Sequence, residues 1–366
     1  MNQLPLYELH HTLGAHFSAL NGAQVVSDYG HPAAEYTALR ESAGVMDLSF
    51  RSRLCLVGAD RARYLHGQVT NDVKKLQVGE GCYSALTTNK GKMEGDLNIF
   101  CLPDELLLDF EPGLAGKISA RLEKFIVADD VQIVDAAPHY GLLSVQGPKA
   151  DAVVRAIGLF PEIPAQRFAS LKISEAMLGE IYLANNPRLD LSGTTGFDLF
   201  IPTASLGAVA DKLIGAAKNV GGGAVGWMTW ETVRIEAGIP RFGADMDETN
   251  IPLECGIESR AIVYNKGCYI GQEVINRIHS VGHVNRELRG LRLADDLPAL
   301  PARGDRLFHA GKEVGLVTSA VKSPKLNANI ALGYVRREAG QIGNELTLRT
   351  AAGESLARIS ELPFVK

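Results

Sequence analysis

The sequence of 366 residues is poor in cysteine and has no long apolar run. Its five cysteines are odd in number and include no Cys-x-x-Cys pair, which argues against a disulfide framework and favours a reducing compartment. No stretch approaches the roughly 20 apolar residues that cross a bilayer. No Arg precedes Arg40, and the first residues lack the pattern of a signal or transit peptide, so the cytoplasm is the expected location.

Several familiar catalytic signatures are also missing, among them Gly-x-Ser-x-Gly, Walker A and His-Glu-x-x-His. Gly221, Gly223 and Gly226 fit a dinucleotide fingerprint literally, but a helix is expected before them where that fingerprint requires a strand. His279 and His283 lie four apart with no carboxylate or cysteine to complete a ligand set, so no metal site is predicted.

What the sequence does contain predicts a globular protein of two or three domains. Strand-like runs separated by Gly-rich or Pro-containing turns cover residues 83–110, and apolar residues at helical spacing follow at 114–125. A similar succession of strands and helices recurs at 142–214. Because the strands and helices mix without strict alternation, the fold class is predicted as α+β, with two related subdomains that divide near residues 136–141.

The helical signal disappears beyond Gly282. Short alternating runs split by Gly, Pro and Asn predict a small all-β domain there, either a sandwich or a barrel. We therefore expect one domain at 1–281 and another at 282–366. The second domain carries 13 Lys and Arg against 9 Asp and Glu, whereas the whole chain has a net charge of −5, which gives no reason to expect direct binding of nucleic acid.

The densest run of chemically capable side chains is residues 266–273. A thiol that lies near a lysine and near the start of a helix favours its thiolate form. The alternative is an inert, buried cysteine in a tight turn. The run consists of Lys266, Gly267, Cys268, Tyr269, Ile270, Gly271, Gln272 and Glu273.

Two charged residues outside this run also stand out. Asp96 is expected at the entrance to an apolar strand, where a carboxylate is either solvated or functional. Arg234 lies among apolar neighbours, and a buried arginine requires an anionic or hydrogen-bonding partner, either internal or a carboxylate of a ligand.

Five motifs in a fixed order, together with the β-rich C-terminal region, resemble the glycine-cleavage T-protein family of aminomethyltransferases over essentially the whole chain. The motifs are LYELHH at 6–11, AGVMDLS at 43–49, SVQGP at 144–148, RIEAG at 234–238 and MDET at 246–249.

Within that superfamily, residues 266–273 and LHGQVTNDV at 65–73 are similar to the YgfZ-type branch, because T-proteins lack the cysteine. The resemblance implies a folate-binding protein that assists assembly or repair of iron–sulfur proteins, with an indirect effect on tRNA modification. Its implied partners are folate and iron–sulfur client or assembly proteins. The implied role of Cys268 is either transient ligation of iron or a cluster, or reaction with an oxidised or one-carbon species.

The resemblance also implies contacts to tetrahydrofolate or a derivative. Tyr83 would line the path of the pterin and aminobenzoyl groups, Asp198 would bind the pterin edge, and Arg234 would face the folate cavity. A carboxylate suits a pterin because it can accept from two adjacent N–H groups.

Two departures from the T-protein pattern argue against classical aminomethyl transfer. The family's paired aspartates are replaced by Gly95 and Asp96, and Asp109 stands where T-proteins have asparagine. The alternative function is a tetrahydrofolate-dependent aminomethyltransferase or demethylase that acts on a small methylated amine. The expected catalytic residues are Asp96 and Cys268.

Overall fold

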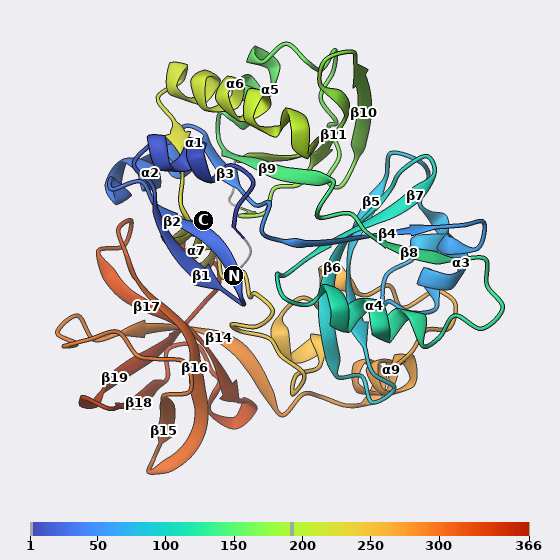
Figure 1. Ribbon diagram of the computed structural model, residues 1–366. Coiled ribbons are helices and arrows are strands. Elements are labelled where there is room, and N and C mark those ends of the chain that lie inside the picture. Colours follow the sequence, from blue (N-terminus) through green and yellow to red (C-terminus); the bar gives the residue numbers. More distant parts are fainter. Residues whose placement is uncertain (1–2, 191–193, 366) are drawn as a thin grey trace. The chain divides into compact units, whose positions relative to one another are not determined.

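The computed structural model describes residues 3–190 and 194–365, whose helices and strands Figure 1 labels. The chain divides into two compact units. Unit 1 comprises the chain up to Gln68, with Asp72–Ser84 and Leu97–Trp230. Unit 2 comprises Val69–Asn71, Ala85–Asp96 and the chain from Glu231 onward. The mixture of sheets and helices confirms the predicted α+β class. The predicted domain division at 281/282 stays a prediction.

One sheet of unit 1 has six strands in the order β10-β11-β12-β9-β3-β13. Neighbouring strands pair antiparallel, except β13 and β3, which are parallel. The strands are β3 (Gly44–Asp47), β9 (Tyr140–Gly147), β10 (Ser170–Glu175), β11 (Gly179–Asn185), β12 (Thr195–Pro202) and β13 (Gly223–Ala224).

Two helices, α5 (Ala150–Ala156) and α6 (Leu206–Asn219), contribute to the apolar core of this sheet. The apolar stripe that the sequence predicts on α6 is buried, because Leu206, Val209 and Leu213 are fully inaccessible to solvent. Long aliphatic side chains at helical spacing therefore hold α6 against the core, as expected.

The second sheet has five strands in the order β5-β6-β7-β4-β8. The sequence predicts consecutive antiparallel strands here, and the pairings of β6 with β7 and of β4 with β7 and β8 are antiparallel. The strands are β4 (Ser52–Val57), β5 (Gly81–Thr87), β6 (Met93–Cys101), β7 (Glu105–Phe110) and β8 (Gln132–Asp135), and the nearby helices are α3 (Arg61–His66), η1 (Val73–Lys75) and α4 (Ala115–Glu123).

A hairpin near the N-terminus was not predicted. Its turn residues Asn21 and Gly22 both have positive φ, 48° and 82°, as a tight two-residue hairpin turn requires. The elements around it are α1 (Tyr7–Thr12), β1 (His16–Leu20), β2 (Ala23–Asp28) and α2 (Pro32–Glu41), and the later connecting helices are η2 (Thr203–Ser205) and α7 (Trp227–Glu236).

Unit 2 contains a closed six-stranded barrel in the order β14-β17-β16-β15-β18-β19, which confirms the predicted β-rich C-terminal domain. Its interior is filled by aliphatic residues such as Leu291, Val317 and Leu348. The strands are β14 (Arg286–Leu293), β15 (Arg306–His309), β16 (Lys312–Ser323), β17 (Ala328–Arg336), β18 (Glu345–Thr350) and β19 (Gly353–Ser360).

Four short helices complete unit 2: η3 (Pro252–Cys255), α8 (Glu258–Ala261), α9 (Gln272–Val281) and η4 (Arg337–Ala339). Every helix within residues 3–190 and 194–365 is too short or too polar to cross a membrane.

Candidate functional site

Asp198 lies in the middle of β12 and is fully buried. A carboxylate inside a continuous apolar strand must be hydrogen-bonded to persist as an ion. Asn186 donates its Nδ2–H to Asp198 Oδ2 at 2.8 Å, and Arg188 Nε lies 3.0 and 2.9 Å from Oδ1 and Oδ2. Arg188 Nη2 is a further 2.7 Å from Oδ2. The predicted pterin-binding carboxylate thus already accepts several bonds from within unit 1.

Arg188 joins Asp198 to a second buried carboxylate, Asp109 of β7. Its Nη2 lies 2.7 Å from Asp109 Oδ2. Arg51 Nε donates to Asp109 Oδ1 at 2.7 Å, and Asn98 Nδ2 donates to Oδ2 at 2.9 Å. Burial opposes ionisation of Asp109, but the charges of Arg188 and Arg51 outweigh it and hold the pKa of this carboxyl well below its usual range. Asp109 is therefore an anion that two arginines share.

Gln146 and Gly196 fix the segment that carries Arg188. Gln146 Oε1 accepts from the backbone N–H of Arg188 at 3.0 Å, and its Nε2 donates to the carbonyl of Asn186 at 2.9 Å. A Cβ on Gly196 would lie 2.2 Å from Gln146 Oε1, so only glycine leaves room for this buried amide. The SVQGP motif and the glycine before Asp198 thus support the same polar cluster.

This cluster reaches a cavity through Arg51. The cavity in unit 1 has a volume of about 570 Å³, and Arg51 is one of its lining residues together with Ser49 and Phe50. Arg51 also bonds Glu111 at 2.5 Å, and only 11% of its side chain is exposed. A chain of charge pairs therefore runs from the cavity wall through Asp109 and Arg188 to Asp198.

Tyr83, another of the three residues that the resemblance assigns to folate, lies on β5 in unit 1. It is half-buried, between the buried residues Cys82 and Ser84. A partly exposed aromatic ring on a strand is compatible with stacking against a planar ligand, and this contact stays a prediction.

Asp96 lies on β6, in the part of that strand that belongs to unit 2. Glu94 and Asp96 are two residues apart and half-buried, whereas Met93, Gly95 and Leu97 are buried. Side chains two apart on a strand point to the same face. Although the family's second aspartate is replaced by Gly95, Glu94 places another carboxylate on the same face of β6 as Asp96.

Arg234 has anionic partners within the protein. Its sequence context left open whether its partner is internal or a carboxylate of a ligand. It lies in α7 and is buried. Its guanidinium donates to Asp245, to Glu231 Oε2 at 2.7 Å and to Ser319 Oγ at 2.9 Å. Burial opposes the charge, but Asp245 and Glu231 outweigh it and raise the pKa of Arg234. A contact of this side chain with folate stays a prediction.

Residues 266–271 of this run lie in the connection between α8 and α9, and its last two residues begin α9. Lys266 Nζ donates to the carbonyls of Val69 and Asn71 at 2.7 and 2.6 Å and lies 5.0 Å from the ring centre of Tyr269. Thr87 Oγ1 donates to the carbonyl of Ile270 at 2.7 Å. The lysine and the threonine thus fix both ends of the segment that carries Cys268.

Cys268 itself is exposed, so the expectation of a buried cysteine in this turn is wrong, whereas the reactivity of its thiol stays a prediction. Gly271 and Gln272 follow as the N-cap and the first residue of α9, and Glu273 is exposed in its first turn. Gln272 Nε2 donates to the carbonyl of Gly267 at 3.4 Å. Cys55, Cys82 and Cys255 are buried and Cys101 is half-buried, so Cys268 is the accessible thiol in the described part of the chain.

Sequence reasoning missed Arg51, Asn186 and Arg188. Asp109 offered a signal, because a carboxylate inside the apolar run at 106–110 requires a buried cationic partner. The sequence could not identify that partner, since Arg188 lies 79 residues away.

Comparisons with known proteins cover nearly the whole chain. The family model described as the GCVT N-terminal domain matches residues 6–266, and the one described as the glycine cleavage T-protein C-terminal barrel domain matches residues 286–366.

Relatives of the chain include two proteins named aminomethyltransferase. The one from Shouchella clausii (strain KSM-K16) is 28% identical over 367 residues, which are 99% of this chain and 97% of the relative. The one from Rubrobacter xylanophilus is 28% identical over 368 residues, 100% of this chain and 95% of the relative.

A solved structure, that of glycine cleavage system aminomethyltransferase T from Bartonella henselae, is similar with a TM-score of 0.89 and 25% identity. The similarity covers 100% of this chain and 98% of that one.

Proposed function

The chain belongs to the glycine cleavage T-protein family, and from this premise we propose that it is a tetrahydrofolate-dependent enzyme that takes a one-carbon unit from a small methylated or aminomethyl amine. Aminomethyltransferases of this family use tetrahydrofolate. The full-length match to proteins of that name carries the proposal and favours this alternative over the iron–sulfur function as the main activity.

The polar cluster of unit 1 suits a pterin. Asp198 accepts from two adjacent nitrogens of Arg188, Nε and Nη2, and a pterin edge offers the same kind of adjacent donors. Bound folate would therefore take over bonds that Arg188 now makes to Asp198. The buried surroundings would strengthen such bonds, because water does not compete for them. Tyr83 and Arg234 are the further proposed folate contacts.

Tetrahydrofolate would supply the nitrogen that accepts the one-carbon unit. The role proposed for Asp96 is to hold or receive a proton at the amine nitrogen, which requires its carboxylate within hydrogen-bond reach of that atom. Glu94, on the same face of β6, supplies a second negative charge. A pair of carboxylates stabilises a cationic amine. Glu94 could therefore compensate for the missing aspartate, whose absence argued against aminomethyl transfer.

The test is formation of methylene-tetrahydrofolate from tetrahydrofolate and an aminomethyl donor, whose carbon is already at the oxidation level of formaldehyde and leaves its nitrogen as ammonia. Assays with sarcosine and dimethylglycine include an added electron acceptor, because a methyl group must lose two electrons to become methylene. Asp96→Asn should lower kcat by about 100-fold or more, as loss of a general acid or base does. Glu180→Gln, which removes a partly exposed carboxylate of β11, is the control and should retain wild-type kcat. Absence of turnover with every donor would contradict the enzymatic proposal.

The exposed thiol supports a second proposed function, the YgfZ-type role in iron–sulfur protein assembly or repair. Cys268 is accessible and lies on a segment that Lys266 and Thr87 hold in place. A soft thiolate ligand suits transient binding of iron, and the partner protein would supply the other ligands. The test is complementation of a deletion strain with Cys268→Ala, with Cys101→Ala as the control variant. Full recovery of iron–sulfur enzyme activity by Cys268→Ala would contradict this second role.

A further inference from the structure

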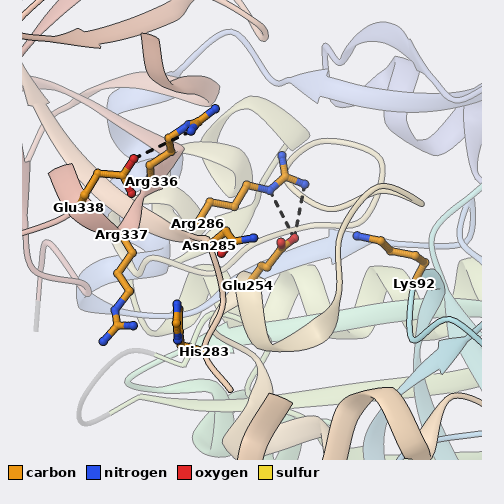
Figure 2. A pocket seen from close by; sticks show the side chains of 8 residues that line it. All are labelled: Lys92, Glu254, His283, Asn285, Arg286, Arg336, Arg337 and Glu338. Carbon is orange, nitrogen blue, oxygen red and sulfur yellow. Dashed lines mark hydrogen bonds and ion pairs between the residues drawn. The ribbon is translucent and has the colours of Figure 1, made fainter. Parts of the chain in front are cut away.

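A second cavity lies within unit 2, and none of its lining residues is among those assigned to the proposed folate or amine site. Its volume is about 780 Å³. Its walls come from the turn before β6, from η3, from the start of β14 and from the end of β17 with η4 (Figure 2). The lining residues are mostly charged: Lys92, Glu254, His283, Asn285, Arg286, Arg336, Arg337 and Glu338.

The charges that line this cavity do not cancel. Both carboxylates are already paired with arginines, Glu254 with Arg286 at 3.4 Å and Glu338 with Arg336 at 3.9 Å. Within residues 3–190 and 194–365, neither Lys92 nor Arg337 forms an ion pair. The cavity therefore keeps an excess of positive charge, which attracts anions.

Two of the cations converge on one atom. Lys92 Nζ donates to the carbonyl oxygen of Thr249 at 2.6 Å, and Arg286 Nη2 donates to the same oxygen at 3.3 Å. Because they share this acceptor, Lys92 Nζ and Arg286 Nη2 lie close to one another. Glu254 already pairs with Arg286. The neutral carbonyl compensates the remaining charge of Lys92 poorly, whereas an anionic group between the two cations would bind both.

The side chain of Arg286 and the backbone of Arg337 have contacts of their own within unit 2. The guanidinium of Arg286 lies 5.0 Å from the ring centre of Tyr334, a cation–π contact. The backbone N–H of Arg337 donates to the carbonyl of Asn285 at 3.0 Å, which ties η4 to the start of β14. In Figure 2 the side chains of Arg337 and His283 lie away from Lys92, and both line the cavity.

We propose that this cavity binds an organic anion that carries two or more carboxylate or phosphate groups. One group would bridge Lys92 and Arg286, and another would bind Arg337 and His283. The forked N–H groups of arginine match the oxygens of either kind of group. This site goes beyond one-carbon transfer and does not depend on it, because none of its residues belongs to the proposed folate or amine site.

Calorimetric titration at low salt with pyrophosphate and with tri-glutamate tests the proposal and separates the two sources of the anion. At least one probe should bind to the wild type. Lys92→Gln and Arg337→Gln should each weaken that binding about tenfold, as loss of a charge-assisted hydrogen bond does. Binding of pyrophosphate alone would identify a phosphate ligand, and binding of tri-glutamate alone a carboxylate ligand; both support the site.

Arg349→Gln is the matched control, since Arg349 is an exposed arginine of the same barrel that pairs with Glu354 outside this cavity. It should leave binding unchanged. Equal weakening in this control would show general attraction to a basic surface and would overturn the proposal, as would failure of both probes to bind. Affinity of Arg337→Gln for tetrahydrofolate should stay at the wild-type value, which separates this site from the proposed folate site.

Discussion

Arg188 binds Asp198 through a fork, with its Nε 3.0 and 2.9 Å from the two carboxylate oxygens. The carboxylate is fully buried, and only 9% of the arginine side chain is exposed. A pterin that uses Asp198 must therefore compete with a protein side chain for the same oxygens. The strength of folate binding then depends on the difference between the interaction of Asp198 with the pterin and its interaction with Arg188.

Asp198→Asn tests whether this carboxylate binds the pterin. The substitution keeps the size of the side chain but replaces one acceptor oxygen by a donor, so affinity for tetrahydrofolate should fall about tenfold to a hundredfold. Calorimetric titration measures the affinity, and a thermal unfolding curve checks that the variant is folded. Asp104→Asn, which changes an exposed aspartate of unit 1, is the control. Wild-type affinity in Asp198→Asn would place the pterin elsewhere.

Asp109→Asn should destabilise the protein strongly, because it leaves Arg51 and Arg188 buried with one carboxylate partner fewer. The expected loss is about 3–5 kcal/mol of unfolding free energy, measured by urea denaturation near pH 7. Asp104→Asn should cost less than about 0.5 kcal/mol. A similar small loss for both variants would mean that the arginines find other partners.

The stability of the wild type and that of Asp109→Asn should depend differently on pH in acid. The folded-state pKa of Asp109 lies below its unfolded value of about 3.9, because Arg188 and Arg51 outweigh the effect of burial. Its contribution to stability is therefore complete above that value and is lost as the pH falls below it. The stability difference between wild type and Asp109→Asn should narrow from about pH 4 downward. A constant difference down to pH 3 would contradict the assigned shift.

Local patterns in the sequence predicted the elements well where one face of the chain is apolar. The stripe at Leu206, Val209 and Leu213 identified α6, and the alternating runs beyond residue 282 identified the barrel strands. The hairpin formed by β1 and β2 was missed although Asn21-Gly22 is a strong turn signal. Its first strand is largely exposed and offers little apolar alternation.

Long-range pairing explains what the sequence could not supply at the candidate site. Asp109 and Asp198 stood out through the resemblance to the T-protein family, but nothing local in the sequence indicates that Arg188 bridges them. Arg234 illustrates the opposite case, since its need for an anionic partner was visible and Glu231 and Asp245 meet it nearby in the chain. Buried charges are predictable one at a time, whereas their partners depend on the folded topology.

Cys268 should react with iodoacetamide faster than the other cysteines of the folded protein. It is exposed, whereas burial raises the pKa of Cys255 to about 12 and raises the pKa of Cys101 as well. Mass spectrometry after brief labelling near pH 7.5 should find the modification mainly at Cys268. Cys268→Ala should lose the rapid phase and Cys101→Ala should keep it. Rapid labelling that survives in Cys268→Ala would show that another thiol is accessible.

Gly271→Ala should destabilise the segment that carries Cys268 for two separable reasons. Gly271 has φ of +91°, which strains any residue with a Cβ, and that Cβ would lie 2.6 Å from the carbonyl oxygen of Thr88. Gly343 has nearly the same φ, +89°, but an added Cβ there meets nothing within 4 Å. Gly343→Ala therefore measures the backbone strain alone, about 1–2 kcal/mol.

The clash at Gly271 should add about 1–3 kcal/mol to that cost, because a backbone carbonyl cannot move as a flexible side chain can. Urea denaturation of the two variants measures the difference, and the rate of labelling at Cys268 reports whether the displaced turn changes exposure of the thiol. Gly271→Ala should alter that rate and Gly343→Ala should not. Equal costs for the two variants would mean that the turn relaxes away from Thr88, and that the conformation of residues 266–273 is set by Lys266 and Thr87 rather than by the glycine.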